Sequence, residues 1–153
     1  MKVVILRVAK GNVSWADEAT AVYLNRIQRH WKVSEAKLKL APKGEVKKRR
    51  KIESAQIKSF LGVRDRLILL EERGEQASTE TLASWLEMAM NMGTQRLVFA
   101  IGGPFGHDES LHPQAWKKLG LSKMVLNHEV ARVVLAEQLY RASTIIYGGQ
   151  YHH

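Results

Sequence analysis

Apolar residues follow two alternating patterns along this chain. Short continuous runs of Val, Ile and Leu alternate with longer stretches in which apolar residues return every three or four positions. The continuous runs are typical of strands buried on both faces, and the spaced pattern is typical of amphipathic helices. Strands are therefore predicted over residues 3–9, 33–40, 66–70, 96–101 and 121–126.

Helices are predicted between these strands, over residues 14–31, 45–61, 78–92 and 129–143, with a short helix over 112–119. The first helix, which Asn12 or Ser14 can cap, carries apolar residues every four positions: Trp15, Ala19, Tyr23, Ile27 and Trp31. The second helix is expected to place most of its basic residues away from the core. The residues expected on its core-facing side are Ile52, Ala55, Gln56 and Phe60.

Strands that alternate with helices predict a single α/β domain over residues 1–153, with a mostly parallel sheet and helices on both faces. Ligands bind such sheets beyond the carboxyl ends of the strands. Three loops are expected to meet there, over residues 71–74, 102–106 and 122–128. The glycine-rich loop 102–106 allows backbone to approach a ligand closely, although a turn of this kind is also typical of a simple tight connection.

The last predicted helix is apolar nearly all round. Such a helix must be buried, either in the centre of the domain or against another subunit. Asn127 can cap it, and Glu137 and Arg141 stand four residues apart in the order that favours pairing. Arg132 lies one turn inside the helix, close to His128. A desolvated arginine there requires either a carboxylate partner or an anion from a substrate.

Positive charge is concentrated in the second quarter of the chain. The net charge is +9, and residues 26–51 contain eleven of the 24 Lys and Arg residues. Such a field attracts a polyanion such as nucleic acid. A solvated charged helix face is the alternative. A membrane surface is disfavoured, because residues 47–51 contain no Trp or Phe to enter the interface.

Several kinds of chemistry are disfavoured by the sequence. The chain has no cysteine, which excludes disulfides and thiolate metal sites and suits the cytoplasm. No metal is expected, since the histidines have no metal-site spacing; His107, Asp108 and His112 are the nearest to such a set. Dinucleotide-binding, P-loop and serine-nucleophile motifs are missing. No apolar run is long enough to span a membrane or to form a signal peptide.

Three motifs and the end of the chain resemble a known family. They are Ile101-Gly102-Gly103-Pro104-Phe105-Gly106, Leu126-Asn127-His128-Glu129-Val130-Ala131-Arg132-Val133, Glu137-Gln138-Leu139-Tyr140-Arg141-Ala142 and Tyr151-His152. In this order and spacing they resemble the RlmH family, the 23S ribosomal RNA pseudouridine-N3 methyltransferases of the SPOUT superfamily. The chain length, the first strand and the basic second quarter are similar too, so the resemblance covers the whole chain.

The resemblance implies a C-terminal deep trefoil knot, which periodicity alone could not have shown. It also implies a homodimer, and S-adenosylmethionine as the cofactor with S-adenosylhomocysteine as its product. The family's cofactor positions fall on residues that must act mostly through backbone groups and apolar walls. They are Leu70, Gly102, Gly103, Ser122, Lys123, Met124, Val125, Leu126 and Asn127.

The implied substrate is a pseudouridine in a stem-loop of large-subunit ribosomal RNA on the ribosome. Its N3 would attack the methyl carbon in line, and the neutral thioether would leave without help from a metal. The residues expected around the base are His128, Arg132, Tyr151 and His152. His128 or His152 could accept the N3 proton, Arg132 could hold a phosphate or the developing anion, and Tyr151 could stack on the base.

Two other functions remain open. A SPOUT methyltransferase acting on transfer RNA would share the fold and the cofactor. A non-enzymatic RNA-binding protein would explain the charge but not the three loops. Two positions depart from the family pattern, because Asn127 and residues 148–150 stand where relatives commonly have proline. The start of the last helix and the tail are expected to differ accordingly.

Overall fold

The computed structural model describes residues 1–152. It contains five strands, four α-helices and two short 3₁₀ helices within those residues. In chain order they are β1 (Lys2–Val8), α1 (Ser14–Ile27), β2 (Lys32–Leu38), α2 (Val46–Phe60), β3 (Asp65–Glu75), α3 (Thr79–Asn91), β4 (Arg96–Ile101), η1 (Glu109–Gln114), β5 (Ala115–Leu119), α4 (His128–Tyr147) and η2 (Gln150–His152).

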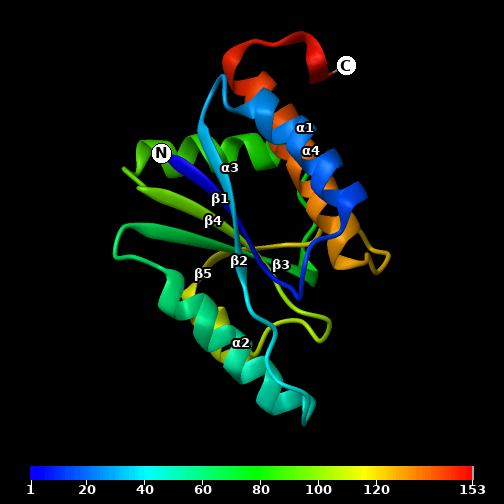
Figure 1. Cartoon of the computed structure of the whole chain (residues 1–153). Coiled ribbons are helices and arrows are strands. Elements are labelled where there is room, and N and C mark those ends of the chain that lie inside the picture. Colours follow the sequence, from blue (N-terminus) through cyan, green and yellow to red (C-terminus); the bar gives the residue numbers. More distant parts are fainter. Residues whose placement is uncertain (153) are drawn as a thin grey trace.

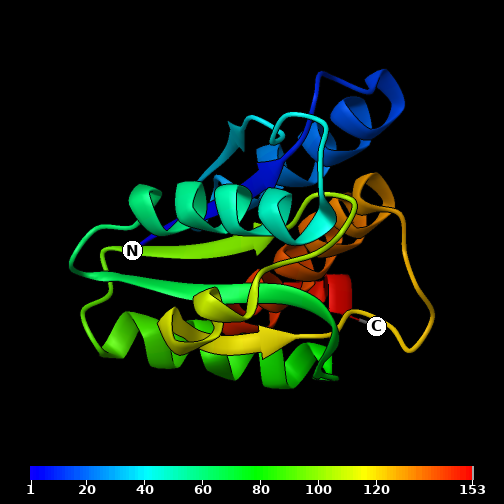
Figure 2. The ribbon, with the colours of Figure 1, turned by 90° about the horizontal axis from the view of Figure 1, so that it is seen from below.

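The strands form one sheet in the order β2-β1-β4-β3-β5, and every pair is parallel. Figure 1 shows α1, α3 and α4 on one side of this sheet and α2 on the other, and Figure 2 shows the sheet between α2 and α3. The predicted α/β fold with helices on both faces is therefore confirmed. Because the strands are parallel, their carboxyl ends lie at one edge.

Each face of the sheet has its own apolar core. Val3 and Ile5 of β1 pack with α1, α3 and α4, whereas Val4 and Leu6 pack with α2 and η1. Successive side chains of a strand point to opposite faces, so a strand that is covered on both sides must be apolar at every position. This explains the continuous apolar runs of β1, β3 and β4.

The last strand lies earlier than predicted. The predicted strand over 121–126 and the predicted helix over 112–119 are both wrong, because β5 covers Ala115–Leu119 and a loop follows it. β5 is an edge strand that pairs with β3 alone. Leu119 is buried and Trp116 packs against the core, while Lys118 stays in water. The lysines of this edge strand interrupt its apolar pattern, so the sequence did not predict the strand.

Two elements extend beyond their predicted ends. β3 continues past Leu70 to Glu75, whose carbonyl accepts a hydrogen bond from the Gly120 amide at 3.0 Å. Gly74 allows this approach, since a Cβ there would lie 2.6 Å from the Gly120 nitrogen. α4 continues past residue 143 to Tyr147, where Gly148 ends it with φ of 77°. Even so, no helix in residues 1–152 is long and apolar enough to cross a membrane.

The buried faces of α1 and α2 differ from those predicted. α1 buries Ala16, Thr20 and Ile27, whereas Trp15 is 51% exposed, and no side chain caps the helix. Residues four apart drift by about 40° per step around a helix, so a stripe of five cannot share one face. α2 buries Glu53, Ser54 and Ile57. Its inner face is therefore largely polar, and the predicted apolar side, with Ile52, is partly exposed.

Candidate active site

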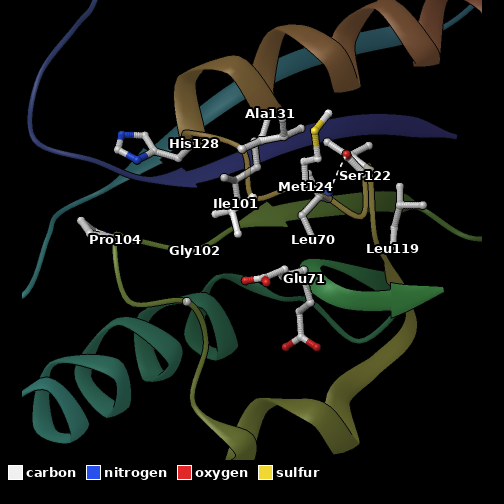
Figure 3. A pocket seen from close by; sticks show the side chains of 16 residues that line it. Leu70, Glu71, Ile101, Gly102, Pro104, Leu119, Ser122, Met124, His128 and Ala131 are labelled. Atoms are coloured by element: carbon white, nitrogen blue, oxygen red, sulfur yellow. Dashed lines mark hydrogen bonds between the residues drawn. The ribbon is translucent and has the colours of Figure 1, made fainter. Parts of the chain in front are cut away.

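A cavity of about 200 Å³ opens at the carboxyl edge of the sheet (Figure 3). Its walls come from residues 70–72 of β3, from the ends of β4 and β5, from the chain that follows these two strands, and from the first turn of α4. The three segments expected at one edge, 71–74, 102–106 and 122–128, all contribute residues to it.

Seven of the nine residues expected at the cofactor line this cavity. They are Leu70, Gly102, Gly103, Ser122, Met124, Val125 and Leu126. The other two lie beside it: the Lys123 side chain is exposed, and Asn127 caps α4 by accepting a hydrogen bond from the Glu129 amide at 2.8 Å. The structure thus brings most of the set together, and cofactor binding by these residues stays a prediction.

The glycine-rich turn forms one wall mainly with its backbone. The Gly106 amide donates to the Gly103 carbonyl at 3.0 Å, and Gly106 has φ of 74°, a conformation that favours glycine. Gly102 and Gly103 expose no side chain to the cavity, so a ligand can contact their peptide groups directly. Ile101 at the end of β4 and Leu70 within β3 supply the apolar surface beside them.

The opposite wall is the loop between β5 and α4. Ser122 Oγ accepts a hydrogen bond from the Met124 amide at 2.9 Å, which turns the chain around the cavity. Met124 and Val125 are 75% and 74% exposed, although both line the cavity. Large apolar side chains in water at the rim of a cavity are typical of a surface that a ligand or partner covers.

His128 stands at the mouth of the cavity, at the first position of α4. Figure 3 shows its imidazole on the same side of the site as Pro104. The ring is about one-third exposed, and its Nε2 lies 3.7 Å from Glu129 Oε1. This imidazole is therefore accessible to a substrate and has a carboxylate close by.

Arg132 does not line the cavity. Its side chain is 0% exposed and is surrounded by carboxylates from three elements: Asp17 of α1 at 2.7 Å, Glu129 of α4 at 2.9 Å and Glu35 of β2 at 3.4 Å. Arg7 of β1 joins the same cluster through Glu129 at 3.3 Å. The carboxylate partners that the sequence allowed for Arg132 are therefore present. Its contact with a substrate stays a prediction.

Tyr151 lies at the other end of α4. Its ring is 4.5 Å from that of Tyr140, and the Arg141 guanidinium lies 4.8 Å from its centroid. His152 ends η2, and its side chain lies outside the part of the chain that the structure describes. Within one chain, therefore, Tyr151 is separated from His128 by the whole length of α4.

Two further residues at the site were missed at the sequence level. Glu71 lines the cavity, and its Oε1 lies 2.7 Å from His112 Nε2. His107 lies behind the glycine turn, with Cε1 3.1 Å from where a Gly102 Cβ would be. Burial lowers the pKa of His107, although the negative charge of Glu71 acts in the opposite direction and raises it. The signal was available in Glu71, a charged residue directly after the apolar run Leu67–Leu70.

The chemistry of the cavity follows from these walls. Apolar side chains and free peptide groups suit a flat heterocycle, Glu71 and Glu72 suit hydroxyl or cationic groups, and the imidazole of His128 can move a proton at the mouth. No three His, Asp or Glu side chains within the described residues converge to hold a metal ion. The arrangement is that of a binding site with two carboxylates in its wall and an imidazole at its mouth.

Comparison with known proteins identifies a family whose sequence pattern matches nearly the whole chain. Residues 1–152 match the family described as "Predicted SPOUT methyltransferase". Three relatives are named "Ribosomal RNA large subunit methyltransferase H". The relative from Geotalea daltonii is 39% identical to this chain over the full length of both. Those from Geobacter sp. and Porphyromonas gingivalis are 37% and 32% identical over all of this chain and 99% of the relative. The chain therefore belongs to the SPOUT methyltransferase family.

Proposed function

We propose that this protein is an S-adenosylmethionine-dependent methyltransferase that methylates N3 of a pseudouridine in a stem-loop of large-subunit ribosomal RNA. The observation that carries this proposal is the cavity at the carboxyl edge of the sheet, lined by seven of the nine residues expected to hold the cofactor. Relatives that match the full chain and are named as ribosomal RNA large subunit methyltransferases support the choice of substrate.

The walls of the cavity suit S-adenosylmethionine. Leu70 and Leu126 would flank the adenine, and the peptide groups of Gly102 and Gly103 would contact it. Glu71, held by His112, places a carboxylate where it can accept hydrogen bonds from hydroxyl or ammonium groups. When bound, S-adenosylmethionine supplies a methyl group that its sulfonium has already activated.

The exposed face of α2 supports an RNA substrate. Lys47, Lys48, Arg50 and Lys51 are all exposed there, while Arg49 and Glu53 of the same helix lie against the glycine turn of the cavity. A run of cations beside the cavity can neutralise phosphates and so orient a stem-loop toward it. The target base itself must be unstacked for its N3 to reach the cavity.

A homodimer would complete the site. α4 has 20 residues and is about 30 Å long, so His128 and Tyr151 of one chain cannot contact the same base. They could do so if two copies of α4 packed antiparallel about a two-fold axis. The exposed Trp15 and Val22 of α1 and the exposed Val130 of α4 supply apolar surface for that contact. The cavity of one chain, about 200 Å³, is also small for a nucleoside cofactor.

The expected catalytic residues divide into two kinds in this proposal. His128 accepts the N3 proton, directly or through water, while Tyr151 and His152 reach the base from the partner subunit. Arg132 acts by position: it holds Glu129, and through it the first turn of α4 and His128. Family membership also supports the C-terminal trefoil knot, and a ribosomal substrate supports a cytoplasmic location.

The decisive experiment is transfer of a tritiated methyl group to ribosomes that lack this modification, followed by mapping of the labelled nucleotide. Label on N3 of a pseudouridine in large-subunit RNA is the expected result. Label in isolated transfer RNA but not in ribosomes would identify a transfer RNA enzyme instead. If no RNA is labelled and calorimetry detects no S-adenosylmethionine binding, the protein is a non-enzymatic RNA-binding protein.

A further inference from the structure

The inner face of α2 is polar where a helix that faces the core is usually apolar. Glu53 is 2% exposed and Ser54 is equally buried. Charged side chains are rarely buried to this degree without a specific reason. Figure 2 shows the segment after β4 running beside α2, so the explanation is to be found in the contacts between them.

Glu53 uses one carboxylate oxygen for a hydrogen bond and turns the other toward the glycine turn. Its Oε1 accepts from the Ala41 amide at 2.9 Å. Its Oε2 is buried and has no hydrogen-bond partner among the described residues. A Cβ added to Gly103 would lie 2.6 Å from this Oε2 and 3.2 Å from the Glu53 Cδ. The carboxylate therefore occupies the place of a side chain at Gly103.

Backbone conformation does not explain why residue 103 is glycine. Gly103 is not among the glycines with positive φ, so its backbone conformation does not itself call for glycine. An alanine methyl group would instead force the Glu53 carboxylate to shift, and it would crowd Leu40 Cδ2 at 3.2 Å. Since Gly103 also lines the cavity, its backbone is held between Glu53 on one side and the ligand space on the other.

Two more side chains of α2 hold the same segment. Ser54 Oγ accepts a hydrogen bond from the Asp108 amide at 2.9 Å, and the Arg49 guanidinium lies 4.9 Å from the Phe105 ring centroid. α2 thus contacts the segment at residues 103, 105 and 108. Of these contacts, the one made by Glu53 falls on a residue that lines the cavity.

The geometry points to Glu53 as a positioning residue of the methyl-donor site, whose carboxylate fixes how far the Gly103 backbone can recede from the cavity. This inference rests on the proposed function. Glu53 does not contact the donor and acts through Gly103. Its loss should therefore weaken donor binding while leaving the exposed cationic face of α2, and with it RNA binding, unchanged.

Calorimetric titration of S-adenosylhomocysteine into the full-length protein tests the assignment. Glu53→Ala is expected to weaken binding about tenfold, and Glu53→Gln, which keeps the volume and an oxygen for Ala41, only about twofold. Gln56→Ala is the matched control, because Gln56 ties the same helix to the Lys39 carbonyl at 3.1 Å. This control should change the affinity by less than about twofold.

A double-mutant cycle tests the contact itself. Gly103→Ala should weaken binding by about tenfold or more in the wild-type background, but by less than about threefold when Glu53 is already alanine, since the methyl group then has room. In the ribosome assay, Glu53→Ala should raise KM for S-adenosylmethionine and leave KM for ribosomes unchanged. Equal losses from Gly103→Ala in both backgrounds would overturn the inference.

The two proposals fail in different ways. If the wild-type protein does not bind S-adenosylhomocysteine, the proposed function is wrong. If the wild type binds it and Glu53→Ala binds it equally well, the role of Glu53 is wrong while the function stands. Melting curves followed by circular dichroism identify a variant that fails to fold. If Glu53→Ala fails to fold, Glu53→Gln is used in its place for the affinity and KM measurements.

Discussion

The two edges of the sheet treat buried polar groups differently. At the amino edge, where β3 and β4 begin, Asp65 accepts hydrogen bonds from Arg96, with Nε at 2.9 Å, and from the Gly62 amide at 2.7 Å. Arg96 also donates to the Phe60 carbonyl at 2.9 Å. Seven described side chains keep a buried nitrogen or oxygen without a hydrogen-bond partner. Thr94 lies at the amino edge and Thr20 on α1, whereas five lie around the carboxyl edge: Arg49, Glu53, His107, Glu129 and Arg132.

This difference distinguishes the amino edge from the edge that carries the candidate site. Buried polar atoms in native proteins nearly always have partners, and exceptions call for an explanation. Five of the seven exceptions among the described residues lie around the cavity and the first turn of α4, and functional sites are where such departures from local rules are expected. Four changes test how far this contrast extends.

The largest effect is expected from Arg132→Ala at the carboxyl edge. The change leaves the carboxylates of Asp17, Glu35 and Glu129 around an empty, buried space, and we expect a loss of about 3–5 kcal/mol in the free energy of unfolding. Urea denaturation measures it. Arg141→Ala, which breaks the half-buried pair with Glu137 on the same helix, should cost at most about 1 kcal/mol. Similar losses for both variants would refute a special role for the buried cluster.

His128→Ala should change activity without changing stability. We expect methyl transfer to slow about a hundredfold, because a positioned base is lost, while the melting temperature stays unchanged. Single-turnover assays with tritiated donor measure the rate. His128→Gln should be equally slow, and the deficit should shrink as the pH rises and hydroxide removes the N3 proton instead. Normal turnover in both variants would remove His128 from the mechanism.

Asp65→Asn tests the amino edge. Burial alone would raise the pKa of Asp65, but hydrogen bonds from Arg96 and the Gly62 amide outweigh it and lower this pKa below its ordinary value. At pH 7 the variant should lose about 1.5–3 kcal/mol of stability and no donor affinity. The wild-type advantage is present above about pH 4 and fades as the pH falls through the lowered pKa. A difference that persisted unchanged in acid would contradict this account.

His107→Gln should have the smallest effect, in a different pH window. Because burial lowers the pKa of His107, the folded state favours the neutral ring, whereas the unfolded chain takes up a proton below about pH 6.5. Wild-type stability should therefore fall as the pH drops below that value, by at most about 1.4 kcal/mol per pH unit for this one group. Urea unfolding between pH 7.5 and 5 should show a shallower decline in the variant. An identical slope would exclude His107 as the cause.

The fold was predictable from the sequence where side-chain burial repeats along one element. β4 was predicted at its observed bounds, because both of its faces are covered and its apolar run is uninterrupted. Asn127 was correctly predicted to cap α4, since capping is a local interaction. β5 was not predicted, because an edge strand with lysines in water has no clear pattern of its own.

Some residues of the candidate site could likewise be identified from the sequence, and others could not. The glycine turn and the loop after β5 could be identified from their residues, and they do line one cavity. Glu53 could not be identified, since its role depends on the distance between its carboxylate and Gly103, which are 50 positions apart in the sequence. The separation of Tyr151 from His128, by contrast, follows from the single helix between them, most of which was predicted from the sequence.

The sequence by itself determined the alternation of strands and helices, the charge of α2 and the residues from which a site could be built, because these depend on neighbours a few positions away. Tertiary structure alone decided which carboxylates surround Arg132 and which side chains a Cβ at residue 103 would meet. Those features depend on contacts between segments far apart in the chain, and such contacts exist only once the sheet has fixed the order of its strands.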